Sequence, residues 1–164
     1  MVRKIKRFFG MAVDQRQLFL QSAILLPLTG LGVRLLGFNR WYAGLSRRAV
    51  GSRISATTSP QPEVVIIQRT LRSVRLASQH GLYPGNCLSR SLTLWWLLRR
   101  QGIECDLRIG VRREQAQLQG HAWIEYKGYP LNEQPQVHQH YAVFAETILP
   151  ADRWESLASL TERC

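Results

Sequence analysis

Residues 86–98 read Asn-Cys-Leu-Ser-Arg-Ser-Leu-Thr-Leu-Trp-Trp-Leu-Leu, and this stretch decides the predicted fold. Its apolar residues recur at three- and four-residue spacings, which is typical of one face of a helix. The turn cluster Tyr-Pro-Gly-Asn at 83–86 precedes it, and two arginines and Gly102 follow it. We therefore expect a helix that begins close to Cys87 and ends before Gly102.

The residues after Gly102 change from helical spacing to alternation. Apolar and polar residues alternate over 103–111 and again over 121–125, which predicts two half-buried strands. The polar residues 112–119 between them predict a connecting loop or hairpin. Lys127-Gly128 predicts a turn, and residues 129–131 predict a third extended piece. The expected fold class is α+β, with a helix packed on an antiparallel sheet.

A thiol, an imidazole and a polar pair occupy key points of this predicted fold. Cys87 lies at the helix start, where the helix N-terminus and a nearby imidazolium favour the nucleophilic thiolate form. His121 begins the second strand and would serve as general base. We predict that Glu133 orients His121, with Asn132 as the alternative. The backbone amide of Cys87 and the side chain of Asn86 are the candidate oxyanion donors.

Each of these residues taken alone also has a purely structural explanation. Cys87 alone could be a small buried core residue, and His121 alone could be a structural histidine. Their combination favours catalysis. Three other histidines, His80, His138 and His140, have no Cys partner at zinc-like spacing, so we expect no metal and no cofactor. Three cysteines without framework spacing fit a reducing cytoplasm.

Four segments together resemble a known family: residues 87–92, 97–100, 109–111 and 121–125. They are similar to the transglutaminase-like cysteine peptidases of lasso-peptide biosynthesis, which have a papain-like arrangement of helix and sheet. Such proteins remove the leader from a ribosomally made precursor peptide. The third member of their catalytic triad is usually an acidic residue shortly after the His strand, and Asn132-Glu133 occupies that place here.

The resemblance implies a leader peptidase with several partners. These are a precursor peptide as substrate, a separate winged-helix leader-binding protein, and an ATP-dependent lasso cyclase that closes the macrolactam. Two alternatives stay open. One is a transglutaminase-like acyltransferase, in which an amine resolves the thioester, and the other is a non-catalytic peptide-binding scaffold protein.

The N-terminal third differs from the rest in charge. Residues 1–55 carry ten Lys or Arg and only Asp14 as an acid, which accounts for +9 of the net charge of +11. We divide the chain into a basic, leucine-rich helical extension with a linker at 1–62 and a peptidase domain at 63–164. Residues 46–62 are rich in Ser, Thr and Pro and predict the linker.

The apolar segment Leu18 to Leu36 predicts two short helices, broken near Pro27 and packed on the core. The leucines expected to cover the core are Leu18, Leu25, Leu28, Leu35 and Leu36. The uncharged apolar part at 23–33 is shorter than the about 20 residues that a membrane-spanning helix needs.

The charge pattern bears on location and binding. We expect a cytoplasmic protein, and a reversible contact of the basic Met1–Phe9 with the inner membrane face is the alternative. No nucleic-acid-binding motif is recognised.

A helix is expected over 63–79, with Val64, Ile67, Leu71, Val74 and Ala77 on its apolar face. Arg69, Arg72 and Arg75 form another face, either solvated or docking an acidic peptide or partner.

Overall fold

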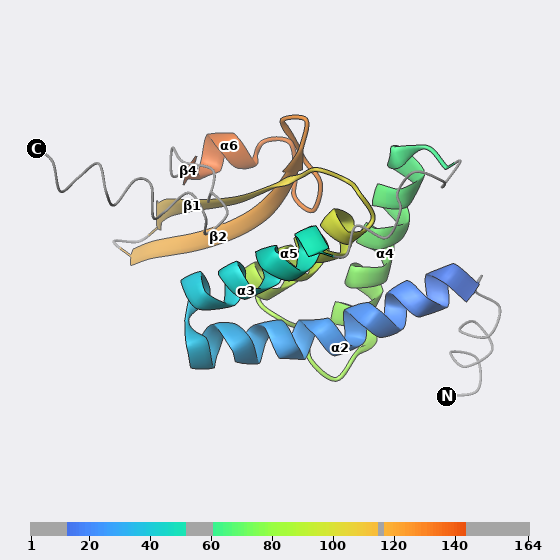
Figure 1. Ribbon diagram of the computed structural model, residues 1–164. Coiled ribbons are helices and arrows are strands. Elements are labelled where there is room, and N and C mark those ends of the chain that lie inside the picture. The colour runs from blue at the N-terminus through green and yellow to red at the C-terminus, as the bar shows by residue number, and fades with distance from the viewer. Residues whose placement is uncertain (1–12, 52–60, 115–116, 144–164) are drawn as a thin grey trace, which may run out of the picture.

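The computed structural model describes residues 13–51, 61–114 and 117–143. Its helices are α2 (Val13–Leu36), α3 (Phe38–Gly51), α4 (Glu63–His80), α5 (Cys87–Arg100) and α6 (Val137–His140). Its strands are β1 (Asp106–Glu114), β2 (Gln117–Tyr126), β3 (Tyr129–Pro130) and β4 (Ala142–Val143). They form one antiparallel sheet in the order β3-β2-β1-β4, with helices packed beside it (Figure 1). The predicted α+β class is confirmed.

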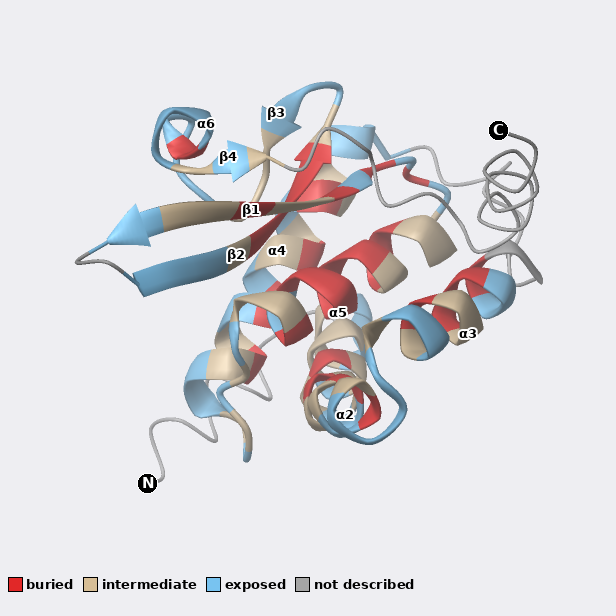
Figure 2. Ribbon diagram, turned by 90° about the vertical axis from the view of Figure 1, so that its left-hand side faces the viewer, coloured by how far each residue is buried: buried red, intermediate tan, exposed pale blue. Residues whose placement is uncertain are grey.

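Helix α5 is the centre of the fold, and Figure 2 shows it deeply buried between the sheet and α2. It contacts α2, α3, α4 and the two long strands. Leu92 and Leu98 on it are completely buried. The side-chain oxygen of Asn86 accepts a hydrogen bond from the backbone N–H of Ser89 at 2.8 Å, which caps the helix. The predicted start of this helix at Cys87 is confirmed.

Strand β2 presents alternate residues to two different environments. Ala122 and Ile124 belong to the apolar core that surrounds α5. His121 and Trp123 make ring contacts with residues of the chain that follows β3. This alternation follows from the two-residue period of a strand. One face of β2 therefore packs in the core, and the other meets the chain that follows β3.

The hairpin between β1 and β2 is more regular than the sequence predicts. Of the predicted loop or hairpin over 112–119, the hairpin is confirmed, and its strands are long: β1 continues to Glu114 and β2 begins at Gln117. Arg112 pairs across the strands with Gln119 and donates to its side-chain oxygen at 2.9 Å. Such polar cross-strand pairs extend a ladder beyond its apolar part. The predicted turn at Lys127-Gly128 and the extended piece after it are confirmed.

The prediction of two short helices broken near Pro27 is wrong. Helix α2 is continuous through Pro27, although a proline inside a helix removes one backbone hydrogen bond. Packing outweighs that cost, because Leu26 and Thr29 are almost completely buried and the Thr29 hydroxyl lies 3.5 Å from that of Thr93 on α5. Leu25 packs on the core as predicted, but Leu28, Leu35 and Leu36 do not cover it and are 47%, 70% and 51% exposed.

Two further predictions at helix boundaries need correction. The prediction of a linker from residue 46 is wrong for 46–51, which form the last part of α3, where Leu45 and Ala49 are buried. In α4, Ile67, Val74 and Ala77 are buried as predicted, whereas Val64 is 57% exposed. Val64 lies in the first turn of α4. Met1–Phe9 lies outside the described residues.

Candidate active site

The structure contains a cleft of about 820 Å³, bounded by α4, α5, β2 and the segment 131–135. We call it the α4–α5 cleft. Of the predicted site residues, Cys87, Asn132 and Glu133 line it, together with Ala122 of β2. Segments from three distant parts of the sequence therefore meet at the start of α5.

Cys87 is the first residue of α5 and is half-buried at the wall of the cleft. Its position follows from the local sequence. Gly85 has a φ of +68°, which lets the chain turn into the helix, and Asn86 then caps the first turn. Asn86 itself does not line the cleft. Its carboxamide oxygen accepts the capping hydrogen bond, and its NH2 group remains available as a donor.

His121 and Glu133 are in direct contact. Nε2 of His121 lies 2.9 Å from Oε1 of Glu133, and the two side chains are 17% and 34% exposed. Glu133 is thus the carboxylate that can hold the imidazole in one orientation and stabilise its protonated form. Since Nε2 is used in this contact, Nδ1 is the ring nitrogen left for proton transfer.

Asn132 has a different set of contacts from its neighbour. Its side-chain oxygen accepts from the backbone N–H of Ile124 at 2.8 Å, and its NH2 group donates to the hydroxyl of Ser91 at 3.0 Å. The Ser91 hydroxyl in turn donates to the backbone oxygen of Ala122 at 2.8 Å. Asn132 therefore ties β2 to α5, while the next residue reaches the imidazole.

No hydrogen bond joins the Cys87 thiol to the His121 imidazole in the described part of the chain. In enzymes without bound substrate, catalytic hydrogen bonds are often long and shorten only in the complex. Glu133 lies between the two groups in this sense: it lines the same cleft as Cys87 and contacts His121, which is not itself among the residues that line the cleft. A thiol, an imidazole and a carboxylate are the groups that cysteine nucleophiles use for attack on a carbonyl.

Two aromatic rings stack against the imidazole, and the sequence reasoning did not identify one of them. The ring of Tyr141 lies 4.9 Å from that of His121, at 25° between the planes, and the ring of Trp123 lies 6.1 Å away at 24°. Gly110 makes room for both, since a Cβ there would lie 3.0 Å from atoms of Trp123 and Tyr141. Alternation along β2 could have paired Trp123 with His121, but no local signal indicates Tyr141.

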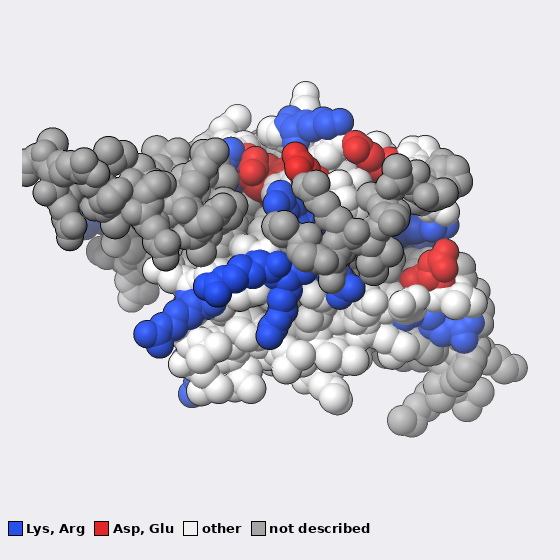
Figure 3. Space-filling view, in the orientation of Figure 1, with Lys and Arg blue, Asp and Glu red and all other residues white. Residues whose placement is uncertain are grey.

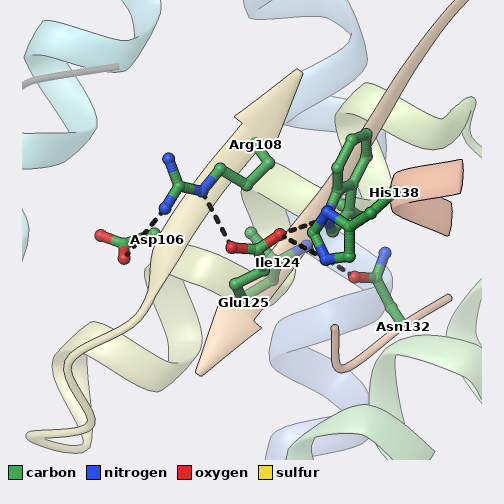
Figure 4. A network of polar contacts seen from close by, with 7 residues as sticks. Asp106, Arg108, Ile124, Glu125, Asn132 and His138 are labelled. Atoms are coloured by element: carbon green, nitrogen blue, oxygen red, sulfur yellow. Dashed lines mark hydrogen bonds and ion pairs between the residues drawn. The ribbon is translucent and has the colours of Figure 1, made fainter. Parts of the chain in front are cut away.

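Trp123 is held by a buried carboxylate that the sequence reasoning also missed (Figure 4). Glu125 is 4% exposed and accepts a hydrogen bond from the indole N–H of Trp123 at 2.8 Å. Arg108 donates to the other oxygen, Oε2, at 2.9 Å, and Nε2 of His138 lies 3.2 Å from Oε1, the oxygen that Trp123 contacts. A buried carboxylate needs such partners, and this network fixes the ring beside His121.

The remaining candidate residues lie elsewhere. Cys105 is buried, and its burial raises the pKa of the thiol from 9.0 to about 12, so it is a poor nucleophile at neutral pH. Cys164 lies outside the described residues. Within ranges 13–51, 61–114 and 117–143, no three His, Cys, Asp or Glu side chains are grouped to hold a metal ion.

Comparison with known proteins identifies a family for this chain and one related processing protein. A model of the transglutaminase-like superfamily matches residues 32–146, which is more than half of the chain and includes α3 to β4. The microcin J25-processing protein McjB of Escherichia coli is 26% identical over 81 residues. That match covers 49% of this chain and 38% of the length of McjB. No solved structure matches the chain.

Proposed function

The chain belongs to the transglutaminase-like superfamily, and from that premise we propose that it is a cysteine peptidase that removes the leader from a lasso-peptide precursor. Two observations support the proposal. The similarity to a microcin-processing protein indicates a role in lasso-peptide processing. The observation that carries the proposal is the contact of His121 with Glu133 at a cleft that Cys87 also lines.

The proposed mechanism assigns one role to each residue. The Cys87 thiol gives its proton to Nδ1 of His121 and attacks the scissile carbonyl, which forms a tetrahedral oxyanion. The backbone N–H of Cys87 and the NH2 group of Asn86 would donate to that oxyanion. His121 then gives the proton to the leaving amine, and a thioester remains on Cys87. Water activated by His121 hydrolyses the thioester, while Glu133 orients the imidazole throughout.

The partners follow from the resemblance and belong to the proposal. The substrate would be a ribosomally made precursor, presented by a separate winged-helix leader-binding protein. An ATP-dependent lasso cyclase would take the cleaved core peptide. We place this work in the cytoplasm. The peptidase would then be slow or inactive alone, because its affinity for the leader would come mainly from the leader-binding protein.

The two alternatives predict different products. A transglutaminase-like acyltransferase would pass the acyl group from Cys87 to an amine, so the product would have the mass of an amide adduct. A hydrolase would instead give a free carboxylate on the leader. A scaffold protein without catalysis would keep its function when Cys87 is replaced by Ala. Mass spectrometry of the products separates the first two cases, and a Cys87→Ala variant tests the third.

The test uses the full chain with a precursor peptide and the leader-binding protein, with products measured by mass. Cys87→Ser and His121→Ala should each lower turnover by at least about 10³-fold and leave the fold intact. Iodoacetamide should label Cys87 before Cys105, because the high pKa of Cys105 keeps that thiol protonated. A Cys105→Ala variant is the matched control and should still cleave. Turnover at the wild-type rate by Cys87→Ser would refute the proposal.

A further inference from the structure

The α4–α5 cleft has basic residues on two of its walls. Arg72 and Arg75 of α4 and Arg90 of α5 all line it. Glu133 is the single acid among the described residues that line the cleft, and it is already in contact with His121. The cleft beside the Cys87 thiol therefore carries an excess of positive charge.

These arginines are not part of the ion pairs that hold the fold together. Within the described residues, neither Arg72 nor Arg75 has a hydrogen bond or an ion pair. Arg69, one turn earlier on α4, is different, because it donates to the side-chain oxygen of Gln61 at 2.8 Å. Arg90 donates through Nε to the backbone oxygen of Asn86 at 3.3 Å, which leaves its two terminal nitrogens for another acceptor.

The spacing of the residues places the charges close to the proposed chemistry. Arg90 follows Cys87 by three residues on α5, so the two side chains lie on the same side of the helix, one turn apart. Arg72 and Arg75 are likewise one turn apart on α4. Between these walls the cleft has an apolar lining of Leu71, Val74, Leu94 and Leu131. A ligand that fits this lining is apolar in part and carries negative charge near the thiol.

We propose that the cleft selects peptides with an acidic side chain close to the bond that Cys87 attacks, and that Arg72, Arg75 and Arg90 bind its carboxylate. This inference rests on the proposed function, because it names the substrate class of the same site. A guanidinium binds a carboxylate through two parallel hydrogen bonds, and these are stronger than hydrogen bonds between neutral groups. An acidic residue next to the scissile bond would also fix the register of the peptide at Cys87.

Binding is measured first, on the Cys87→Ala variant, so that the result does not depend on turnover. The probes are a fluorescent peptide of alternating leucine and glutamate and its leucine–glutamine counterpart. We expect the acidic probe to bind at least about tenfold more tightly, which is typical of a hydrogen bond between charged groups. The preference should weaken as salt rises, because exposed charges are screened.

Matched substitutions then locate the effect. Arg72→Gln with Arg75→Gln should lower the preference for the acidic probe severalfold, with Arg90 retained, and should weaken the acidic probe far more than the neutral one. Arg47→Gln with Arg48→Gln is the control, since it removes the same charge from exposed positions on α3, which do not line the cleft. Equal affinity of the two probes, or an equal loss from both double variants, would overturn the inference.

Cleavage assays separate this inference from the proposed function. Peptide hydrolysis without acidic preference would leave the peptidase standing and refute the acidic substrate class. Acidic preference in binding, with no cleavage of any precursor by the wild-type chain, would support the basic cleft and count against the peptidase. Replacing acidic residues of a cleaved precursor with Asn or Gln should lower kcat/KM more for the wild type than for the Arg72/Arg75 double variant.

Discussion

Helices α2 and α5 are neighbours and α2 is the more apolar of the two, yet only α5 is enclosed by the protein. Leu92 and Leu98 of α5 have no exposed surface, whereas Ile24 and Leu35 of α2 are 60% and 70% exposed. An apolar sequence therefore does not decide burial by itself. Burial depends on how many elements surround the helix, and α5 has the sheet on one side and three helices on the others.

The two helices also differ in what they contribute to the proposed function. The first residue of α5 lines the cleft, and Ser91 one turn later connects it to β2. In α2, none of the residues lines the cleft. Substitutions around α5 should therefore change turnover, substitutions on the buried face of α2 should change stability, and substitutions on its outer face should change neither.

After Cys87 and His121, the largest loss of turnover is expected at Glu133, beside the start of α5. Glu133→Gln should lower kcat by at least about 100-fold, because the imidazole loses the carboxylate that stabilises its charged form. The melting temperature should stay close to that of the wild type, since this side chain is 34% exposed. Turnover assays and thermal unfolding measure the two quantities.

Its neighbour Asn132 provides the control. Asn132→Ala should lower the free energy of unfolding by about 1–3 kcal/mol, because the backbone N–H of Ile124 loses its acceptor. It should lower kcat much less than Glu133→Gln does. The opposite result, an active Glu133→Gln and a stable but inactive Asn132→Ala, would replace the proposed arrangement by Cys-His-Asn.

A smaller effect, on stability alone, is expected on the buried face of α2. A Cβ at Gly32 would lie 2.3 Å from the ring of Trp41 on α3, so Gly32→Val must displace that ring. Overpacking of this kind costs about 1–3 kcal/mol of folding free energy. Leu31→Ala, one residue away on the exposed face, should change it by less than about 0.5 kcal/mol. Urea unfolding of both variants makes the comparison, and equal losses would contradict the two-faced description of α2.

The central part of the fold could be predicted because its local signals agree with one another. The turn, the helical spacing, the two arginines and the final glycine all indicated α5, and alternation indicated the strands. Cys87, His121 and Glu133 could be chosen from residue type and place, and their catalytic roles stay a prediction. Tyr141 could not, because its contact with His121 depends on the path of the chain after β3.

The errors lie where local rules compete with packing. Pro27 predicts a break, but the contacts of the buried face hold α2 together. The sequence of α2 is apolar on both faces, so periodicity could not show which leucines turn inward. The sequence did not indicate the hydrogen bonds of Asn132 and Glu125 either, because their partners Ile124 and Arg108 lie on other elements.

The outer face of α2 leads to the prediction with the smallest effect on turnover and stability. A stripe of large apolar residues runs along it at three- and four-residue spacing and is about half exposed or more: Leu20, Ile24, Leu28, Leu31 and Leu35. By length and composition, α2 is also apolar enough to cross a membrane. In α2 and α3 together there are five arginines and one acid. Figure 3 shows a band of basic residues over α3, beside an uncharged surface over α2.

An apolar stripe beside a basic band is suited to the surface of an anionic bilayer, with leucines among the acyl chains and arginines at the headgroups. The wild-type chain should therefore bind phosphatidylglycerol vesicles more tightly than phosphatidylcholine vesicles, and less tightly at high salt. Ile24→Ser with Leu31→Ser should weaken this binding by more than about tenfold, because each side chain contributes about 1.5–3 kcal/mol when fully buried. Cleavage in solution should not change, since neither residue lines the cleft. If the wild type does not bind anionic vesicles in low salt, the stripe has a different partner.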